Sequence, residues 1–139
     1  MAQRVAEIMT PDPVTVSEKT PVAEVARLMR EKNIGDVIIT EAEHVRGLVT
    51  DRDLVVRAIA EHRDPDSTTV GEVCSSDLVT CSPQDRIDQA VQLMREHTLR
   101  RLPVVEGDRV VGALSLGDLA VERDPRSVLS DISAAEPNR

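Results

Sequence analysis

The stretch Gly47-Leu48-Val49-Thr50-Asp51-Arg52-Asp53-Leu54 decides the fold, because the chain contains it twice. Sixty-five positions later the chain reads Gly112-Ala113-Leu114-Ser115-Leu116-Gly117-Asp118-Leu119. Each copy is a short apolar run, then a hydroxyl residue, and then an aspartate three positions further on. This order is typical of a strand that runs directly into a helix, whose first N–H groups suit an anion.

Two interpretations of the hydroxyl–aspartate pair stay open. A hydroxyl and a carboxylate at this spacing suit a phosphate and the hydroxyl groups of a ribose. Thr50-x-x-Asp53 and Ser115-x-x-Asp118 also have the form of a capping box, with aspartate in place of the usual glutamate or glutamine. For one isolated copy the helix cap is the favoured interpretation, and the second copy shifts the balance towards a ligand.

The similarity extends well beyond these stretches. Leu-Met-Arg-Glu occurs at 28–31 and again at 93–96, and the offset stays at 65 without a gap. Apolar spacing predicts amphipathic helices alternating with short buried strands. The expected elements of the first copy are helix 5–9, strand 14–16, a helix from Pro21 to about Asn33, strands 37–39 and 45–50, and helix 51–62. Thr20 is expected to cap the helix that begins at Pro21 with its hydroxyl group. The second copy repeats them, including a strand at 79–81.

This pattern predicts an α/β fold of two β-α-β-β-α units that share one core. We expect the amino-terminal helix of each unit to pack near its partner unit. The predicted boundaries are 5–62 for the first unit, 63–69 for a linker, 70–123 for the second unit and 124–139 for a carboxy-terminal tail.

Composition narrows the function classes. The net charge is −8 and the chain has no Phe, Tyr or Trp. An acidic chain repels nucleic-acid backbones, and the missing aromatic side chains remove the usual stacking platforms for single strands. Because no apolar run reaches the ~20 residues of a membrane span and no signal region is present, we expect a cytoplasmic protein. Cys74 and Cys81 have neither a zinc nor a redox spacing and are expected to be apolar fillers.

Further motifs accompany the repeated stretch. They are Ile8-Met9-Thr10, Val14-Thr15-Val16, the 22–29 helix and Asn33-Ile34-Gly35-Asp36-Val37 in the first half, with Val79-Thr80 and 97–105 in the second. This ordered set resembles a tandem pair of cystathionine-β-synthase (CBS) motifs over about residues 5–122. The chain is most similar to small stand-alone CBS-pair proteins, including the hypoxic-response type.

The resemblance implies two motifs packed about a pseudo-twofold axis, with two clefts that take adenosine-type ligands such as AMP, ADP, ATP or S-adenosylmethionine. It implies phosphate and ribose contacts for the hydroxyl–aspartate elements. We expect no catalytic residue, no metal and no required cofactor. The residues of one implied cleft are Thr80, Arg100, Arg101, Leu102, Pro103, Ser115 and Asp118. Those of the other are Thr15, Val37, Ile38, Thr50, Arg52 and Asp53.

The two halves differ in charge. The first has Asp36 where the second has Arg101, while Arg52 corresponds to Gly117. A carboxylate about 4 Å from a phosphate opposes it by roughly 1–4 kcal/mol, depending on hydration. We therefore expect the second half to be occupied, with ribose on Asp118, phosphate near Ser115, the base against Leu102 and Pro103, and Thr80 at its edge.

Two functional hypotheses follow. The first is a regulatory module that binds an adenine nucleotide between the motifs and signals to an unidentified protein partner. The second is a module that dimerises without a ligand. Helix 51–62 is apolar on more than one face, and its counterpart carries Leu116, Leu119, Ala120 and Val121, so we expect a homodimer. An enzyme is disfavoured, because the chain has no recognisable nucleophile–base pair, metal cluster or P-loop.

Overall fold

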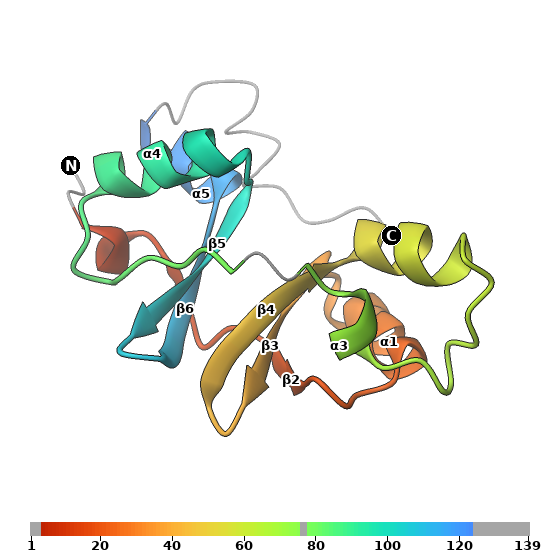
Figure 1. Cartoon of the computed structure of the whole chain (residues 1–139). Helices are drawn as coiled ribbons and strands as arrows, with labels where there is room; N and C mark the ends of the chain where they lie inside the picture. The colour runs from red at the N-terminus through yellow and green to blue at the C-terminus, as the bar shows by residue number, and fades with distance from the viewer. Residues whose placement is uncertain (1–3, 76–77, 124–139) are drawn as a thin grey trace. The chain divides into compact units, whose positions relative to one another are not determined.

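The computed structural model describes residues 4–75 and 78–123, so the predicted tail lies outside the described residues. The chain forms two compact units. Of the described residues, one unit contains 14–75 and 78, and the other combines 4–13 with 79–123. Figure 1 shows the elements of each unit. The predicted α/β fold with a duplicated arrangement of strands and helices is confirmed.

The unit of residues 14–78 is a three-stranded sheet with helices. Strand β2 pairs with β3 in parallel, and β3 pairs with β4 in antiparallel order. Val25, Val37 and Val49 belong to one buried apolar cluster on one face of this sheet. The elements in order are β2 (Thr15–Ser17), α1 (Val22–Lys32), β3 (Asp36–Glu41), β4 (His44–Thr50), α2 (Asp51–Asp53), the π-helical turn η2 (Leu54–Ile59) and α3 (Val70–Val73).

The other unit repeats this plan with a different edge strand. Strand β6 pairs in antiparallel order with both β5 and β1. Leu102, Leu114 and Met94 lie in its own apolar cluster, so each unit has a cluster where the sequence predicts one shared core. The elements in order are the 3-10 turn η1 (Val5–Glu7), β1 (Thr10–Pro11), α4 (Ile87–His97), β5 (Arg101–Glu106), β6 (Arg109–Ser115) and α5 (Leu116–Arg123).

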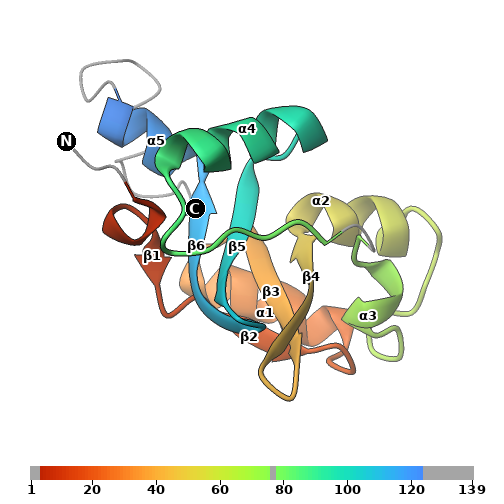
Figure 2. The same ribbon diagram turned by 60° about the vertical axis from the view of Figure 1, so that its left-hand side comes forward.

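The amino-terminal segment of each repeat packs into the unit formed by the other repeat, as expected. Val5 is fully buried in the cluster of the second repeat, and its N–H donates to Asp85 O at 2.9 Å. Val70 is buried in the cluster of the first repeat, and its N–H donates to Thr20 O at 2.9 Å. Figures 1 and 2 show both exchanges, with red η1 beside α4 and green α3 beside orange α1.

The glycine that opens each decisive stretch is explained by this exchange. A Cβ on Gly112 would lie 2.6 Å from Met9 Sδ and 3.0 Å from Thr10 O, both on the exchanged segment. A Cβ on Gly47 would lie 3.3 Å from Ser75 O. At Gly112 only a residue without a side chain allows the exchanged segment to approach this closely, whereas at Gly47 a side chain would require a shift of a few tenths of an ångström.

Three local expectations were wrong. Helix 51–62 divides into a short α2 and the π-helical η2, in which Ala60 N–H donates to Val55 O five residues back. Thr20 does not cap α1 through its side chain. Residues 64–68 of the predicted linker supply the cap, since Val22 and Ala23 donate their N–H groups to Thr68 O and Pro65 O at 2.8 and 2.9 Å.

The third difference concerns the expected strand at 79–81. Cys81 and Val104 form only an isolated parallel bridge there, whereas β2 in the first repeat is a strand. In the first repeat Ile38 N–H donates to Val14 O at 3.1 Å. The matching residue is Pro103, which has no N–H, so this bond cannot form and the pairing is shorter.

Candidate functional site

Both hydroxyl–aspartate pairs lie where a strand passes directly into a helix, and both form complete capping boxes. Asp53 N–H donates to Thr50 Oγ1 at 3.1 Å, and Thr50 N–H donates to Asp53 Oδ2 at 2.9 Å. Asp118 N–H donates to Ser115 Oγ at 3.0 Å, and Ser115 N–H donates to Asp118 Oδ2 at 2.9 Å. The helix-cap interpretation is therefore correct for both copies.

A cap and a ligand are compatible at these turns. An ionised carboxylate offers about four acceptor positions, and each cap uses only one of them. All four side chains are partly exposed, and the carboxylates lie in the first helical turn, where the helix dipole favours negative charge. Each turn therefore presents an aspartate that can accept hydroxyl donors while it holds the helix.

The register of the hairpins places one charged residue directly opposite each hydroxyl. Asp36 pairs with Thr50 across β3 and β4, and Arg101 pairs with Ser115 across β5 and β6. Directly opposed Cβ atoms in an antiparallel pair are about 4.5–5.5 Å apart. An aspartate thus stands across the strands from the hydroxyl residue in the first repeat, and an arginine stands there in the second.

The loop before each hairpin adds a second charge difference. Asp51 N–H donates to Gly35 O at 2.9 Å, and Leu116 N–H donates to Arg100 O at 2.8 Å, so the two repeats match in backbone. In the first repeat a Cβ on Gly35 would lie 3.1 Å from Asp51 Oδ2, which shows that the Asp51 carboxylate covers this glycine. The second repeat has exposed Arg100 and Leu116 in these places.

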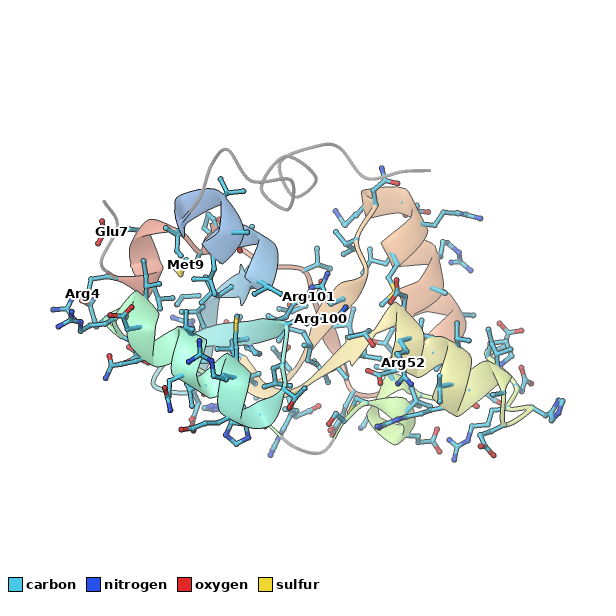
Figure 3. The ribbon with its side chains drawn as sticks, turned by 90° about the horizontal axis from the view of Figure 1, so that it is seen from above. Arg4, Glu7, Met9, Arg52, Arg100 and Arg101 are labelled. Atoms are coloured by element: carbon cyan, nitrogen blue, oxygen red, sulfur yellow. The ribbon has the colours of Figure 1, made fainter. Side chains whose placement is uncertain are left out.

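Figure 3 labels the three arginines of the implied clefts, with Arg52 on the helix that follows β4, and Arg100 and Arg101 at the start of β5. Arg52 is exposed and has two neighbouring aspartates, Asp51 and Asp53. Its own backbone N–H donates to Asp51 Oδ1 at 2.8 Å. The cations of the second repeat are consecutive, with Arg100 directly before β5 and Arg101 its first residue, whereas Arg52 lies in an acidic turn.

The apolar residues of the implied clefts divide between the two faces of each sheet. Val37 and Leu102 belong to the apolar clusters of their own units, so only their backbone can meet a ligand. Ile38 is just as buried but belongs to neither cluster. Ile38 lies beside Thr15 in the parallel pair and on the same face as Thr50, because side chains alternate along a strand.

The second repeat has the same division. Pro103 shares the face of Ser115 and Arg101. The residue after Thr80 bonds to this strand, since Cys81 N–H donates to Pro103 O at 3.1 Å. The structure therefore brings Arg101, Pro103 and Ser115 together and turns Leu102 away.

Sequence reasoning missed Asp51, Gly35 and Arg57. Arg57 is half exposed, and its Nε lies 3.9 Å from Asp53 Oδ1. The four-residue spacing of Asp53 and Arg57 on a predicted helix could have indicated this pair. The contact of Asp51 with Gly35 depends on how the loop meets the helix, for which the sequence contains no signal.

Neither thiol is prepared to act as a nucleophile. Burial raises the pKa of Cys81 to about 12. Burial also raises the pKa of Cys74, with a further increase from the Asp53 charge and a decrease from the Arg57 charge. Reactive cysteines have a lowered pKa instead. Within residues 4–75 and 78–123, no three His, Cys, Asp or Glu side chains gather as a metal site would require.

Comparison with known proteins decides the family. The CBS domain family model matches residues 5–59 and again residues 70–124. The chain belongs to the CBS domain family. A CBS domain-containing protein, YhcV of Bacillus subtilis (strain 168), is 40% identical over 119 residues, which are 86% of this chain and 84% of YhcV.

Two solved structures of CBS proteins resemble the chain in fold. The crystal structure of Hypoxic Response Protein I with two coordinated zinc ions has a TM-score of 0.79 at 30% identity, covering 88% of this chain and 99% of that protein. A signal-transduction protein with CBS domains from Burkholderia ambifaria has a TM-score of 0.79 at 30% identity, covering 89% and 96%. The predicted resemblance to a stand-alone CBS pair of the hypoxic-response type is confirmed, and these similarities support a regulatory module. Within the described ranges no helix combines the length and apolarity needed to cross a bilayer.

Proposed function

We propose that this CBS pair is a cytoplasmic regulatory module that binds an adenine nucleotide at the turn between β6 and α5 and signals its occupancy to a protein partner. The observation that carries the proposal is the pairing of Arg101 with Ser115, directly across the strands, with Asp118 in the same turn. This arrangement supplies a cation and a hydroxyl for a phosphate, and a carboxylate for ribose hydroxyl groups. No catalytic step is proposed.

The contrast with the first repeat supports the choice of turn. Its matching positions hold Asp36 opposite Thr50, and Asp51 beside Gly35. Each carboxylate about 4 Å from a phosphate would cost roughly 1–4 kcal/mol, and each guanidinium there would contribute a similar amount. A phosphorylated ligand is therefore favoured at the second repeat, where the backbone of the turn is the same and the charge is opposite.

The test is titration calorimetry of AMP, ADP and ATP with the unmodified protein and with two matched variants. Asp118→Ala and Asp53→Ala each remove one capping carboxylate, so they have comparable effects on the helix. We expect Asp118→Ala to weaken binding about 10- to 150-fold, the equivalent of roughly 1.5–3 kcal/mol, and Asp53→Ala to leave it unchanged. If binding is lost in Asp53→Ala and kept in Asp118→Ala, the ligand binds the first repeat, and the proposed position at the second repeat is refuted. Absence of heat with every nucleotide at millimolar concentration would refute nucleotide binding.

A ligand-independent dimer is the second candidate function, and one specific observation favours it. Val55 and Ile59 on η2 are 54% and 65% exposed in the isolated chain, and Leu116 on α5 is 44% exposed. Apolar side chains grouped on a helix surface usually mark an interface. We expect light scattering to give twice the chain mass at micromolar concentration, and Val55→Glu to give the mass of a single chain. A single-chain mass for the unmodified protein would refute the dimer.

A further inference from the structure

Arg57 connects the first hydroxyl–aspartate turn to the exchanged segment. Its Nε lies 3.9 Å from Asp53 Oδ1, and its Nη1 donates to Cys74 O at 3.2 Å and to Val73 O at 3.5 Å. The last carbonyl groups of a helix have no partner within the helix, and an arginine is a favourable donor to them. Arg57 therefore has two anchors at the end of α3, and these hold its guanidinium beside Asp53.

The helix that carries Arg57 is unusual. Residues Leu54–Ile59 form a π-helical turn, whereas the second repeat continues as the regular α5. Ala60 N–H donates to Val55 O at 2.8 Å, and Arg63 N–H donates to Ala58 O at 3.0 Å, both five residues back. Turns of this kind are rare in proteins, and those that occur are often at functional sites. The sequence position that matches Arg57 in the second repeat is Glu122, which has the opposite charge.

These contacts determine which oxygens of Asp53 can receive a ligand. Oδ2 accepts from the backbone of Thr50, and Oδ1 faces Arg57. Asp53 itself is mostly buried, with 14% of its side chain exposed. A ribose hydroxyl that approaches Asp53 must therefore compete with the guanidinium charge beside Oδ1 for the acceptor positions that the cap leaves open.

We propose that Arg57 is a specificity-determining residue that occupies Asp53 from within the chain and so keeps adenosine-type ligands off the first repeat. The inference rests on the proposed function, because it explains why one of two similar turns is used. The first turn is a closed copy of the second, and removing Arg57 opens it. Because Asp36 and Asp51 remain there, the ligand that enters is an uncharged nucleoside and not a nucleotide.

Cys74 reports occupancy of the first turn directly. Its carbonyl accepts the Arg57 bond, and the charges of Asp53, Arg57 and Glu18 all act on its thiol. Cys81 is 3% exposed, so a thiol reagent is expected to modify Cys74 first. An adenosine molecule whose ribose hydroxyl groups donate to Asp53 partly screens that carboxylate from the Cys74 thiol, and the alkylation rate of Cys74 changes with it. A ligand in the second repeat leaves the rate unchanged.

The experiment titrates adenosine into the unmodified protein, Arg57→Gln, Arg57→Lys and the control Arg30→Gln, following heat and Cys74 alkylation. Arg30 is an exposed arginine of α1 in the same unit, so its substitution makes the same charge change away from the turn. In Arg57→Gln we expect an additional binding event per chain, about two- to tenfold tighter than any binding at that turn before the change. Alkylation of Cys74 becomes strongly dependent on adenosine in Arg57→Gln, less so in Arg57→Lys, which keeps the charge without the planar fork, and not at all in Arg30→Gln.

The outcomes separate this inference from the proposed function. If Arg57→Gln binds no additional adenosine and Cys74 alkylation stays independent of it, Arg57 does not close the first turn. That result stands whether or not AMP binds the second repeat. If the unmodified protein binds no nucleotide and Arg57→Gln binds adenosine with a change at Cys74, the inference is upheld and nucleotide binding at the second repeat is refuted.

Discussion

Replacing Thr98 with asparagine is expected to stabilise the protein, because Thr98 ends α4 in the left-handed conformation. Its φ and ψ are 54° and 49°. An L-residue in this region costs roughly 1–2 kcal/mol, and a β-branched side chain is particularly unfavourable there. The conformation is required by the helix end, since Thr98 N–H and Leu99 N–H both donate to Met94 O, the latter at 2.8 Å.

The first repeat contains the same helix end with a better residue. Asn33 has φ and ψ of 54° and 47°, and Ile34 N–H donates to Met29 O at 3.1 Å. Asparagine is one of the few residues that enter this conformation routinely. We therefore expect Thr98→Asn to raise the free energy of unfolding by about 1 kcal/mol and Asn33→Thr to lower it by about the same amount. Thr98→Gly is expected to gain less, because glycine loses more backbone entropy on folding.

The assay is urea unfolding followed by circular dichroism, with thermal unfolding in parallel. A gain of about 1 kcal/mol corresponds to roughly 3–6 °C in Tm for a chain of this size. His97→Asn is the matched control, since His97 is exposed and helical and the two residues have similar helix propensities. The reasoning is refuted if Thr98→Asn leaves the midpoint unchanged while Asn33→Thr is equally harmless.

Three further results are expected. Gly112→Ala should lower the free energy of unfolding by about 1–3 kcal/mol, because its Cβ would lie 3.0 Å from Thr10 O. Gly47→Ala should cost less, and equal costs for the two variants in urea unfolding would contradict the closer approach at Gly112. Ala42→Gly and Glu43→Gly should each stabilise the protein by roughly 1 kcal/mol, because Ala42 and Glu43 have φ values of 51° and 70° in the β3–β4 turn. Unchanged urea midpoints in both variants would show that these two residues are not strained. The folded pKa of Cys81 is raised to about 12 from 9.0, so the folded state keeps a proton that the unfolded state loses, and stability should fall by about 1.4 kcal/mol per pH unit above pH 9. Cys81→Ala should lose the part of this decline that Cys81 causes and keep only that of Cys74, so its stability should fall less steeply above pH 9; parallel pH profiles of the two proteins in urea would contradict this.

Much of the fold follows from sequence periodicity. The stripe of Val22, Val25 and Met29 predicts α1, and these three residues are buried on its inner face. The π-helical turn could not be predicted in this way, because Leu54 and Ala58 are four apart and fit an α-helix equally well. Thr20 followed by Pro21 has the local form of a helix start, but carbonyl groups some 45 positions later cap the helix. Local signals predict which element forms, and tertiary contacts decide how it ends.

The candidate site was predictable to a similar degree. The repeated hydroxyl–aspartate spacing identifies both turns, and the charge difference between Asp36 and Arg101 can be read from the aligned repeats. Hairpin register is what places these charges directly opposite Thr50 and Ser115. Side-chain direction along a strand turns Leu102 into the apolar cluster, although its neighbour Pro103 lies on the other face. Neither register nor direction follows from residue identity alone.

The exchange of amino-terminal segments means that a repeat defined by sequence is not a unit of folding. A fragment ending near residue 62 would lack Val70 and Val73, which complete its apolar cluster, and would leave its own Val5 without the cluster that buries it. Two such fragments could each supply the amino-terminal segment that completes the apolar cluster of the other, so a single repeat could form a segment-swapped homodimer. Joining two copies in one chain converts that association into an intramolecular one, which no longer depends on protein concentration. The duplication therefore provides a route from a self-associating ancestor to a chain whose halves can diverge in charge while each continues to complete the other.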